Sequence, residues 1–300
     1  GANEERRIDR NTYYDWGSTF GMVRELQPNA VMFSDGGPDI RWVGNEEGWA
    51  RPTNWCMLKR DDFAPGVVDD IEHLRAGQED GTHWVPAEVD VSIRPGWYYH
   101  PSEDHRVKSL ARLLDIYYNS VGRNANFLLN FPVDKRGLIH ERDVEQIMKL
   151  ATVLKADFAV NLASGKPVSA SNVRGNSRKY RVENATDDNP ETYWATDDSV
   201  KQAEFIIELP HPETFNRILM QEYIRLGQRV KKFRVEAFTG NSWKTLAEET
   251  TIGYKRILRL PTTEAARVKL TIEEARACPL ISNIQLFNAP KLLEPPVITR

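Results

Sequence analysis

The spacing of apolar residues changes at Asn161, and this change limits the folds open to the chain. Before Asn161, segments with the apolar spacing of helices alternate with short apolar runs typical of buried strands. After it, helical spacing disappears and short strand patterns between turn-rich segments continue for roughly 130 residues. We therefore predict an α/β domain at residues 1–160, an all-β sandwich at 161–288 and a C-terminal tail at 289–300.

Individual elements can be placed within both parts. In the α/β part we expect helices at 11–26, between Ser102 and Gly122 and at 141–158, and strands at 30–33, 87–94 and 126–132. In the sandwich we expect strands at 204–209, 217–221, 232–238, 255–260, 266–272 and 281–287.

Composition excludes some partners. The formal net charge of -3 is nearly balanced, so a nucleic-acid partner is not indicated, and no apolar run approaches the roughly 20 residues of a membrane span. Cys56 and Cys278 lie far apart, which favours two buried free thiols over a zinc site or a disulfide.

The stretch from Val31 to Glu47, VMFSDGGPDIRWVGNEE, reads as a buried strand that feeds a polar loop. It ends in two adjacent glutamates, Glu46 and Glu47. Either glutamate can supply a proton in an active site, and the alternative is that both are solvated loop acids. The region 48–83 that follows is long and polar, which is typical of a functional loop. Its Trp49 and Trp55 either face a sugar or anchor the loop.

A second group of acids lies on the predicted strand 87–94, where Val89 alternates with Glu88 and Asp90. Acids on a strand face need a ligand or an ion pair, for which Arg41 and Arg94 are the candidates.

Three ordered segments resemble glycoside hydrolase family 29, the α-L-fucosidases, and in particular its α-1,3/1,4-fucosidase subgroup. They are PNAVMFSDGGPDIRWVGNEEG, PAEVDVSIRPGWYYH and SVGRNANFLLNFPVDKRGLIH, within roughly the first 155 residues. The resemblance implies a (β/α)8 barrel-like catalytic domain, of which this chain contains the C-terminal half. It also implies retaining hydrolysis by two carboxyl groups, with no cofactor for catalysis.

The same resemblance implies roles for single residues. The glutamate of its Gly-Asn-Glu motif, Glu46 here, is the general acid/base, with Glu47 as the runner-up. The family's nucleophile is an aspartate followed by Gly-Ala, so the attacking Asp is expected directly before Gly1. Arg41 matches a fucose contact, Trp97 matches an aromatic residue that packs on the sugar, and Glu88 matches a strand that faces fucose or the next sugar.

The resemblance also implies partners. The family's sugar-binding histidines lie further upstream, and none of the six histidines here replaces them. Half a barrel leaves open sheet edges, so we expect an active species that includes the upstream half, in a longer chain or a second chain. The substrate is expected to be a fucosylated oligosaccharide or glycoconjugate, and family members of this type are usually exported, to the periplasm or outside the cell.

The second part resembles a discoidin, or factor 5/8 type C, jelly roll close to carbohydrate-binding module family 32. The signature is NLASGKPVSAS from Asn161, followed by ATDDNPETYW from Ala185. The resemblance implies a structural calcium, with Asp187, Asn189 and Thr192 as candidate ligands, although Asn283 stands where a glutamate ligand is usual.

Two alternatives to a fucosidase stay open at this point. One is a non-catalytic, lectin-like protein that binds carbohydrate through the discoidin-like domain. The other is a retaining glycosidase with a different sugar preference.

Overall fold

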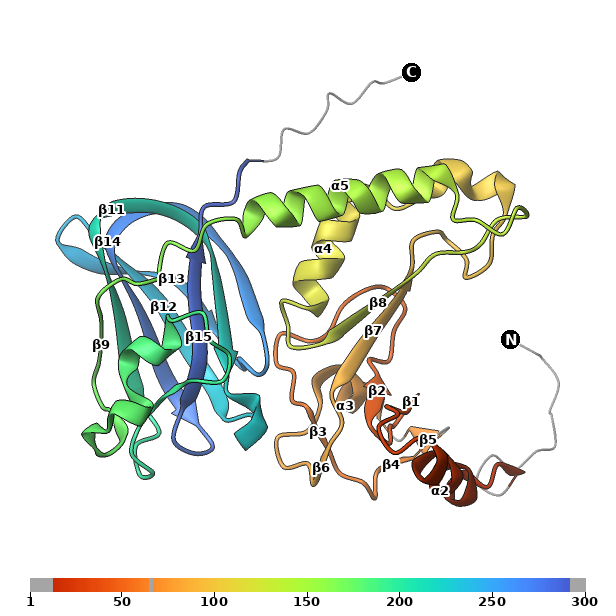
Figure 1. Cartoon of the computed structure of the whole chain (residues 1–300), viewed down its shortest axis with the longest axis horizontal. Coiled ribbons are helices and arrows are strands. Elements are labelled where there is room, and N and C mark those ends of the chain that lie inside the picture. Colours follow the sequence, from red (N-terminus) through yellow and green to blue (C-terminus); the bar gives the residue numbers. More distant parts are fainter. Residues whose placement is uncertain (1–12, 65–66, 69, 292–300) are drawn as a thin grey trace.

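The computed structural model describes residues 13–64, 67–68 and 70–291, which form two lobes side by side (Figure 1). The α/β lobe extends from α2 (Trp16–Leu26) to α5 (Glu141–Asp157). The sandwich extends from β9 (Val168–Ala170) to β15 (Leu280–Phe287). The boundary expected near residue 160 lies in the segment that joins α5 to β9.

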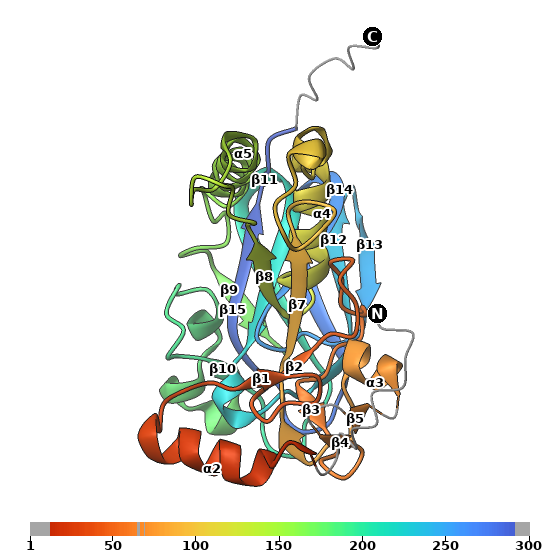
Figure 2. The same ribbon diagram turned by 90° about the vertical axis from the view of Figure 1, so that its right-hand side faces the viewer.

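Four parallel strands form the main sheet of the α/β lobe. Their order is β1 (Phe33–Ser34), β2 (Ile40–Trp42), β7 (Ala87–Ser92) and β8 (Asn126–Asn130). Figure 2 shows β7 and β8 near the centre of this lobe, with α5 and α2 at opposite ends of the view. Because all four strands run in the same direction, the loops that follow them open at one edge of the sheet.

Strand β7 is buried on both faces. Val89 and Val91 pack against Ile116 of α4 (Leu110–Ser120), while Glu88 and Asp90 point to the opposite side of the sheet. The expected strand is therefore confirmed, and its polar face turns away from α4.

The helix expected after Ser102 begins later. Residues Pro101–Arg106 form a 3-10 helix, η1, and α4 starts after Ser109, whose side chain accepts a hydrogen bond from the Arg112 N–H at 3.4 Å. The reason is that the backbone N–H of Lys108 donates to the carbonyl of Ile93 at 2.9 Å. This bond ties the chain to the end of β7 and interrupts the helix. The helix expected at 141–158 is confirmed as α5, whereas Asn11, the expected start of the first helix, lies outside the described residues.

The long segment expected to be a loop contains short elements. They are β3 (Met57–Leu58), β4 (Phe63–Ala64), β5 (Val67–Val68), α3 (Ile71–Ala76) and β6 (His83–Trp84). A small core that includes Leu58, Phe63 and Leu74 holds them together. Trp55 is buried, with the Arg276 guanidinium 5.6 Å from its ring centre, so it anchors the segment and does not face a sugar.

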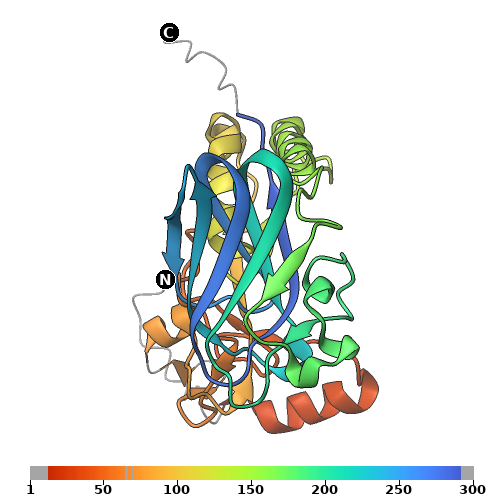
Figure 3. The same ribbon diagram turned by 90° about the vertical axis from the view of Figure 1, so that its left-hand side faces the viewer.

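The sandwich is a seven-stranded antiparallel arrangement. Its order is β10 (Trp194–Ala195), β15, β11 (Ala203–Glu222), β14 (Arg256–Ala275), β12 (Val230–Thr239) and β13 (Ser242–Glu249), with β9 paired to β11. Two pairs of expected strands are single long strands, β11 and β14, which Figure 3 shows curving through the lobe. In β11 the register shifts between Glu208 and Glu213, because a bulge accommodates the two prolines between them without ending the strand. Strand β13, in which exposed and half-buried residues are equally frequent, was not expected from the sequence.

The two lobes share a hydrophobic core. Leu113 and Leu150 of the α/β lobe pack with Leu219, Ile257 and Phe287 of the sandwich. Polar contacts also cross the junction: for example, the side chain of Gln228 accepts a hydrogen bond from the backbone N–H of Cys56 at 2.9 Å. The lobes therefore form one packed unit.

Two expectations from composition can be compared with the structure. Cys56 and Cys278 are buried free thiols, as expected. Within the described part of the chain, no helix combines the length and apolar character needed to cross a membrane.

Candidate active site

The structure brings Glu46 and Trp97 together at the edge of the sheet where the parallel strands end. Glu46 follows β2 and Trp97 follows β7, the neighbouring strand. The indole Nε1–H of Trp97 donates a hydrogen bond to Oε2 of Glu46 at 2.9 Å. The Glu46 side chain is exposed, so a substrate can reach it.

Glu47 points to different partners. Its Oε2 accepts a hydrogen bond from the indole of Trp49 at 2.9 Å, and its carbonyl accepts one from Arg112 of α4. The turn depends on Gly48, which has a φ of 96°, and a Cβ at that position would lie 2.6 Å from Ile116. The glycine-flanked loop thus gives the neighbouring Glu46 and Glu47 side chains different hydrogen-bond partners.

Glu88 and Asp90 lie on the same side of the sheet as Glu46. Glu88 is buried and accepts a hydrogen bond from the side-chain amide of Asn126 on β8. Burial raises the pKa of Asp90 to about 7, and the negative charges of Glu88 and Glu46 add to this effect. Oδ1 of Asp90 is buried and has no hydrogen-bond partner among the described residues. Glu46, Glu88 and Asp90 therefore form a carboxyl cluster.

The position of Arg41 corrects an expectation. Its side chain is fully buried, and its guanidinium donates to the backbone carbonyls of Leu74, Trp55 and Val85 and to the side chain of Asn54. Arg41 pairs in register with Ala87, whereas its neighbour Trp42 pairs with Glu88, so Arg41 points away from the carboxyl cluster. In this structure Arg41 is a structural residue and not a fucose contact.

Among the described residues, the acids of β7 form no ion pair with an arginine. Arg94 is fully buried, and its guanidinium donates instead to Asp143 and Asp104, both at 2.8 Å. The ion pair between the β7 acids and Arg41 or Arg94 was therefore a wrong alternative. The signal for Asp90 was the alternation of acids along β7, and the sequence could not show that Glu46 lies near it.

The candidate calcium ligands gather in one loop of the sandwich. The hydroxyl of Thr192 donates to Oδ2 of Asp187 at 2.7 Å, and the backbone N–H of Asn189 donates to Oδ1 of Asp187 at 2.9 Å. Asn283 donates to Gln221 at 3.0 Å, outside this loop. These hydrogen bonds hold the loop, and calcium binding by Asp187, Asn189 and Thr192 stays a prediction.

A reachable carboxyl group in a loop after a parallel strand, close to further carboxyl groups, is an arrangement compatible with glycoside hydrolysis. Comparison with known families agrees with this class. Residues 21–157 match the family model described as alpha-L-fucosidase, and residues 167–284 match the F5/8 type C domain. At the level of the family, the resemblance read from the sequence is thus confirmed: the chain joins a region of the α-L-fucosidase family to an F5/8 type C domain.

Two similar plant proteins are named as α-L-fucosidases. A putative alpha-L-fucosidase 1 of Oryza sativa is 41% identical over 92% of this chain and 53% of its own length. Alpha-L-fucosidase 1 of Arabidopsis thaliana is 38% identical over 96% of this chain and 56% of its own. The chain therefore spans about half the length of these curated relatives.

Solved structures share the fold. The crystal structure of SpGH29 has a TM-score of 0.87 at 32% identity and covers 96% of this chain and 62% of its own. A putative α-L-fucosidase of Bacteroides thetaiotaomicron has a TM-score of 0.85 at 38% identity, over 91% of this chain and 60% of its own. A Ruminococcus gnavus GH29 fucosidase in complex with fucose has a TM-score of 0.85 at 31% identity, over 97% of this chain and 60% of its own.

Proposed function

We propose that this chain is part of a retaining α-L-fucosidase in which Glu46 is the general acid/base. The observation that carries the proposal is the hydrogen bond from Trp97 to Glu46 at the carboxyl edge of the sheet. The similarity to α-L-fucosidases, one of them solved with fucose, supports the choice of sugar.

In the proposed mechanism two carboxyl groups act in turn. A nucleophile attacks the anomeric carbon while Glu46 protonates the leaving oxygen, and Glu46 then takes a proton from the water that releases fucose. The two groups lie about 5 to 5.5 Å apart in retaining enzymes. We propose an aspartate as the nucleophile, because that is the residue type that the family resemblance implies.

Trp97 and Glu88 are the proposed substrate contacts. The indole of Trp97 orients the Glu46 carboxyl group, and its partly exposed ring is available to the apolar edge of a sugar. One oxygen of Glu88 is held by Asn126, which leaves the other to accept a hydrogen bond from a sugar hydroxyl.

The exposed apolar surface of the α/β lobe supports the proposal that the active species includes an upstream half, in a longer chain or a second chain. Met22 and Leu26 of α2 are 60% and 68% exposed, and Phe33 and Leu128, on the edge strands β1 and β8, are 45% and 43% exposed. Open edges beside exposed apolar side chains are surfaces that another segment can cover. We propose fucosylated glycans with α-1,3- or α-1,4-linked fucose as substrates of the assembled enzyme.

The neighbouring glutamates provide a matched test in the assembled enzyme. Glu46→Gln should lower kcat for an α-fucosyl oligosaccharide by about 10² to 10⁴-fold, because the leaving oxygen loses its acid. Glu47→Gln should change kcat by only a few-fold, because its side chain contacts Trp49.

Two results would contradict this proposal. A larger loss of kcat in Glu47→Gln than in Glu46→Gln would show that Glu47 is the general acid/base. Binding of fucose or galactose by the assembled wild-type protein, without turnover of any α-fucoside, would support the lectin-like alternative.

A further inference from the structure

The buried Arg94 anchors the loop that follows β7, which contains Trp97, Tyr98 and Tyr99. Arg94 is bonded to Asp104 and Asp143, and its guanidinium carbon lies 4.7 Å from the ring centre of Tyr99. The ring of Tyr99 also stacks on His140, with 5.8 Å between the ring centres. Tyr99 is thus held by contacts with two side chains.

The same loop is fixed on its other side by hydrogen bonds to its backbone. The hydroxyl of Ser92 donates to the carbonyl of Gly96 at 2.7 Å, and the side chain of Asn130 donates to the carbonyl of Trp97 at 3.1 Å. Trp97 in turn donates to Glu46. The backbone on both sides of Tyr98 therefore has a defined position.

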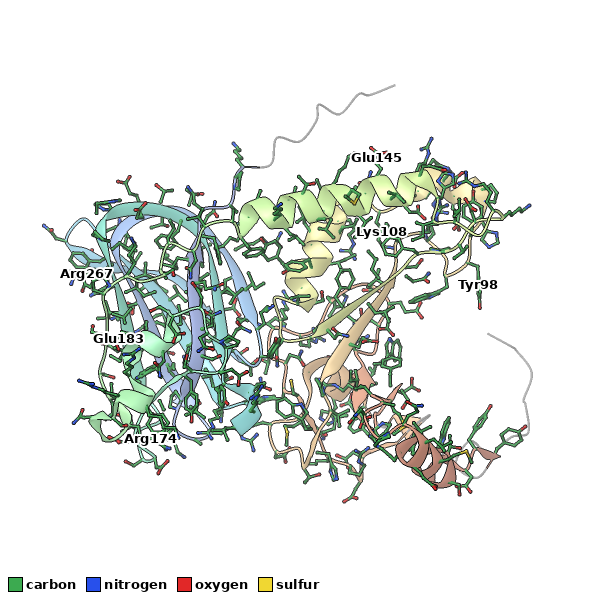
Figure 4. All side chains as sticks on the ribbon, viewed as in Figure 1. Tyr98, Lys108, Glu145, Arg174, Glu183 and Arg267 are labelled. Atoms are coloured by element: carbon green, nitrogen blue, oxygen red, sulfur yellow. The ribbon has the colours of Figure 1, made fainter. Side chains whose placement is uncertain are left out.

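Tyr98 itself is 80% exposed, the largest exposed fraction among the large apolar side chains of the described residues. Figure 4 shows its side chain pointing away from the ribbon, on the side of the α/β lobe that lies far from the sandwich. The Cα atoms of Tyr98 and Trp97 are neighbours about 3.8 Å apart across one peptide bond. An ordered loop therefore presents an exposed aromatic ring next to the residue that holds the proposed acid.

We propose that Tyr98 is the platform for the leaving sugar, the glycan residue from which fucose is cleaved. The inference rests on the proposed function, because a general acid must contact the leaving oxygen, so the leaving sugar must lie beside Glu46. Tyr98 is available to it there, since its ring offers an apolar face to the C–H groups of a pyranose and its hydroxyl offers a hydrogen bond.

The test compares two substrates of the assembled enzyme: an α-1,3-fucosylated oligosaccharide and α-L-fucosyl fluoride, whose leaving group carries no sugar. In Tyr98→Ala the ratio of kcat/KM for the oligosaccharide to kcat/KM for the fluoride should fall about 10-fold. In Tyr98→Phe, which keeps the ring, most of the ratio should remain. Tyr254→Ala, at a 57% exposed tyrosine of the sandwich, is the matched control and should keep the ratio.

Two outcomes would overturn the proposal. One is an unchanged ratio in Tyr98→Ala, whether or not kcat/KM falls equally on both substrates, and the other is the same fall of the ratio in the control. Absence of wild-type turnover on both substrates would instead overturn the proposed function, and the platform with it.

Discussion

Glu46 and Glu47 are neighbours with the same chemistry, yet their surroundings differ. Glu46 meets the indole of Trp97, which follows a different strand, whereas Glu47 meets the indole of Trp49 within its own loop. A difference of one residue therefore decides which carboxyl group joins the carboxyl cluster and which supports the loop.

Asp90 supplies a pH-dependent charge to that cluster. Because burial and its acidic neighbours raise the pKa of Asp90 to about 7, this carboxyl group ionises within the neutral range. We expect kcat/KM of the assembled enzyme to change near pH 7, as a negative charge appears beside Glu46. In Asp90→Asn that inflection should be absent between pH 5 and 9.

The control for this prediction is Asp61→Asn, at an exposed loop acid, which should keep the wild-type profile. If the pH profile of kcat/KM in Asp90→Asn still shows an inflection near pH 7, that inflection belongs to another group and the prediction is wrong.

At the scale of elements, a buried carboxyl group joins three segments of the sandwich. Glu222 ends β11 and is almost fully buried. Its oxygens accept hydrogen bonds from the backbone N–H groups of Arg229, Val230 and Gly253 at 2.7 to 2.9 Å. Since Tyr254 contacts Asn124 of the α/β lobe, this junction also supports the contact between the lobes.

Glu222 predicts a pH dependence of stability. Burial raises its pKa from 4.5 to about 7, although the three N–H groups favour the charged form. In this range the unfolded chain has released its proton while the folded chain still holds it. The contribution of Glu222 to the free energy of unfolding should therefore fall, by about 3 kcal/mol, as the pH rises from about 4.5 to about 7.

Chemical denaturation at several pH values can measure this slope. Glu222→Gln should reduce it, whereas Glu208→Gln, at an exposed position of the same strand, should leave it unchanged. An equal slope in wild type and Glu222→Gln would be inconsistent with the prediction.

At the scale of the whole molecule, the shared core should make the two lobes unfold together. Ile257 is 3% exposed and packs in that core. Ile257→Ala should lower the free energy of unfolding by about 2 to 5 kcal/mol because it leaves a cavity between the lobes. Hydrogen exchange should then show reduced protection in both lobes.

Leu226→Ala, at a 51% exposed position, is the control and should change the free energy of unfolding by about 0.5 kcal/mol or less. Reduced protection confined to the sandwich in Ile257→Ala would show that the lobes unfold independently.

The sequence by itself determined the features that depend on local periodicity and local motifs. These are the α/β part followed by a β part, the strand β7 and the glycine-bounded loop that carries Glu46. Each of these features can be read from a short stretch of sequence, because the periodicity of apolar residues and the turn-forming residues act over a few positions.

Only the tertiary structure decided which residues share a site. Glu46 and Trp97 are 51 positions apart, the direction of Arg41 depends on its register with β7, and the late start of α4 depends on a bond from Lys108 to Ile93. These outcomes follow from packing between segments distant in sequence, which no local pattern encodes.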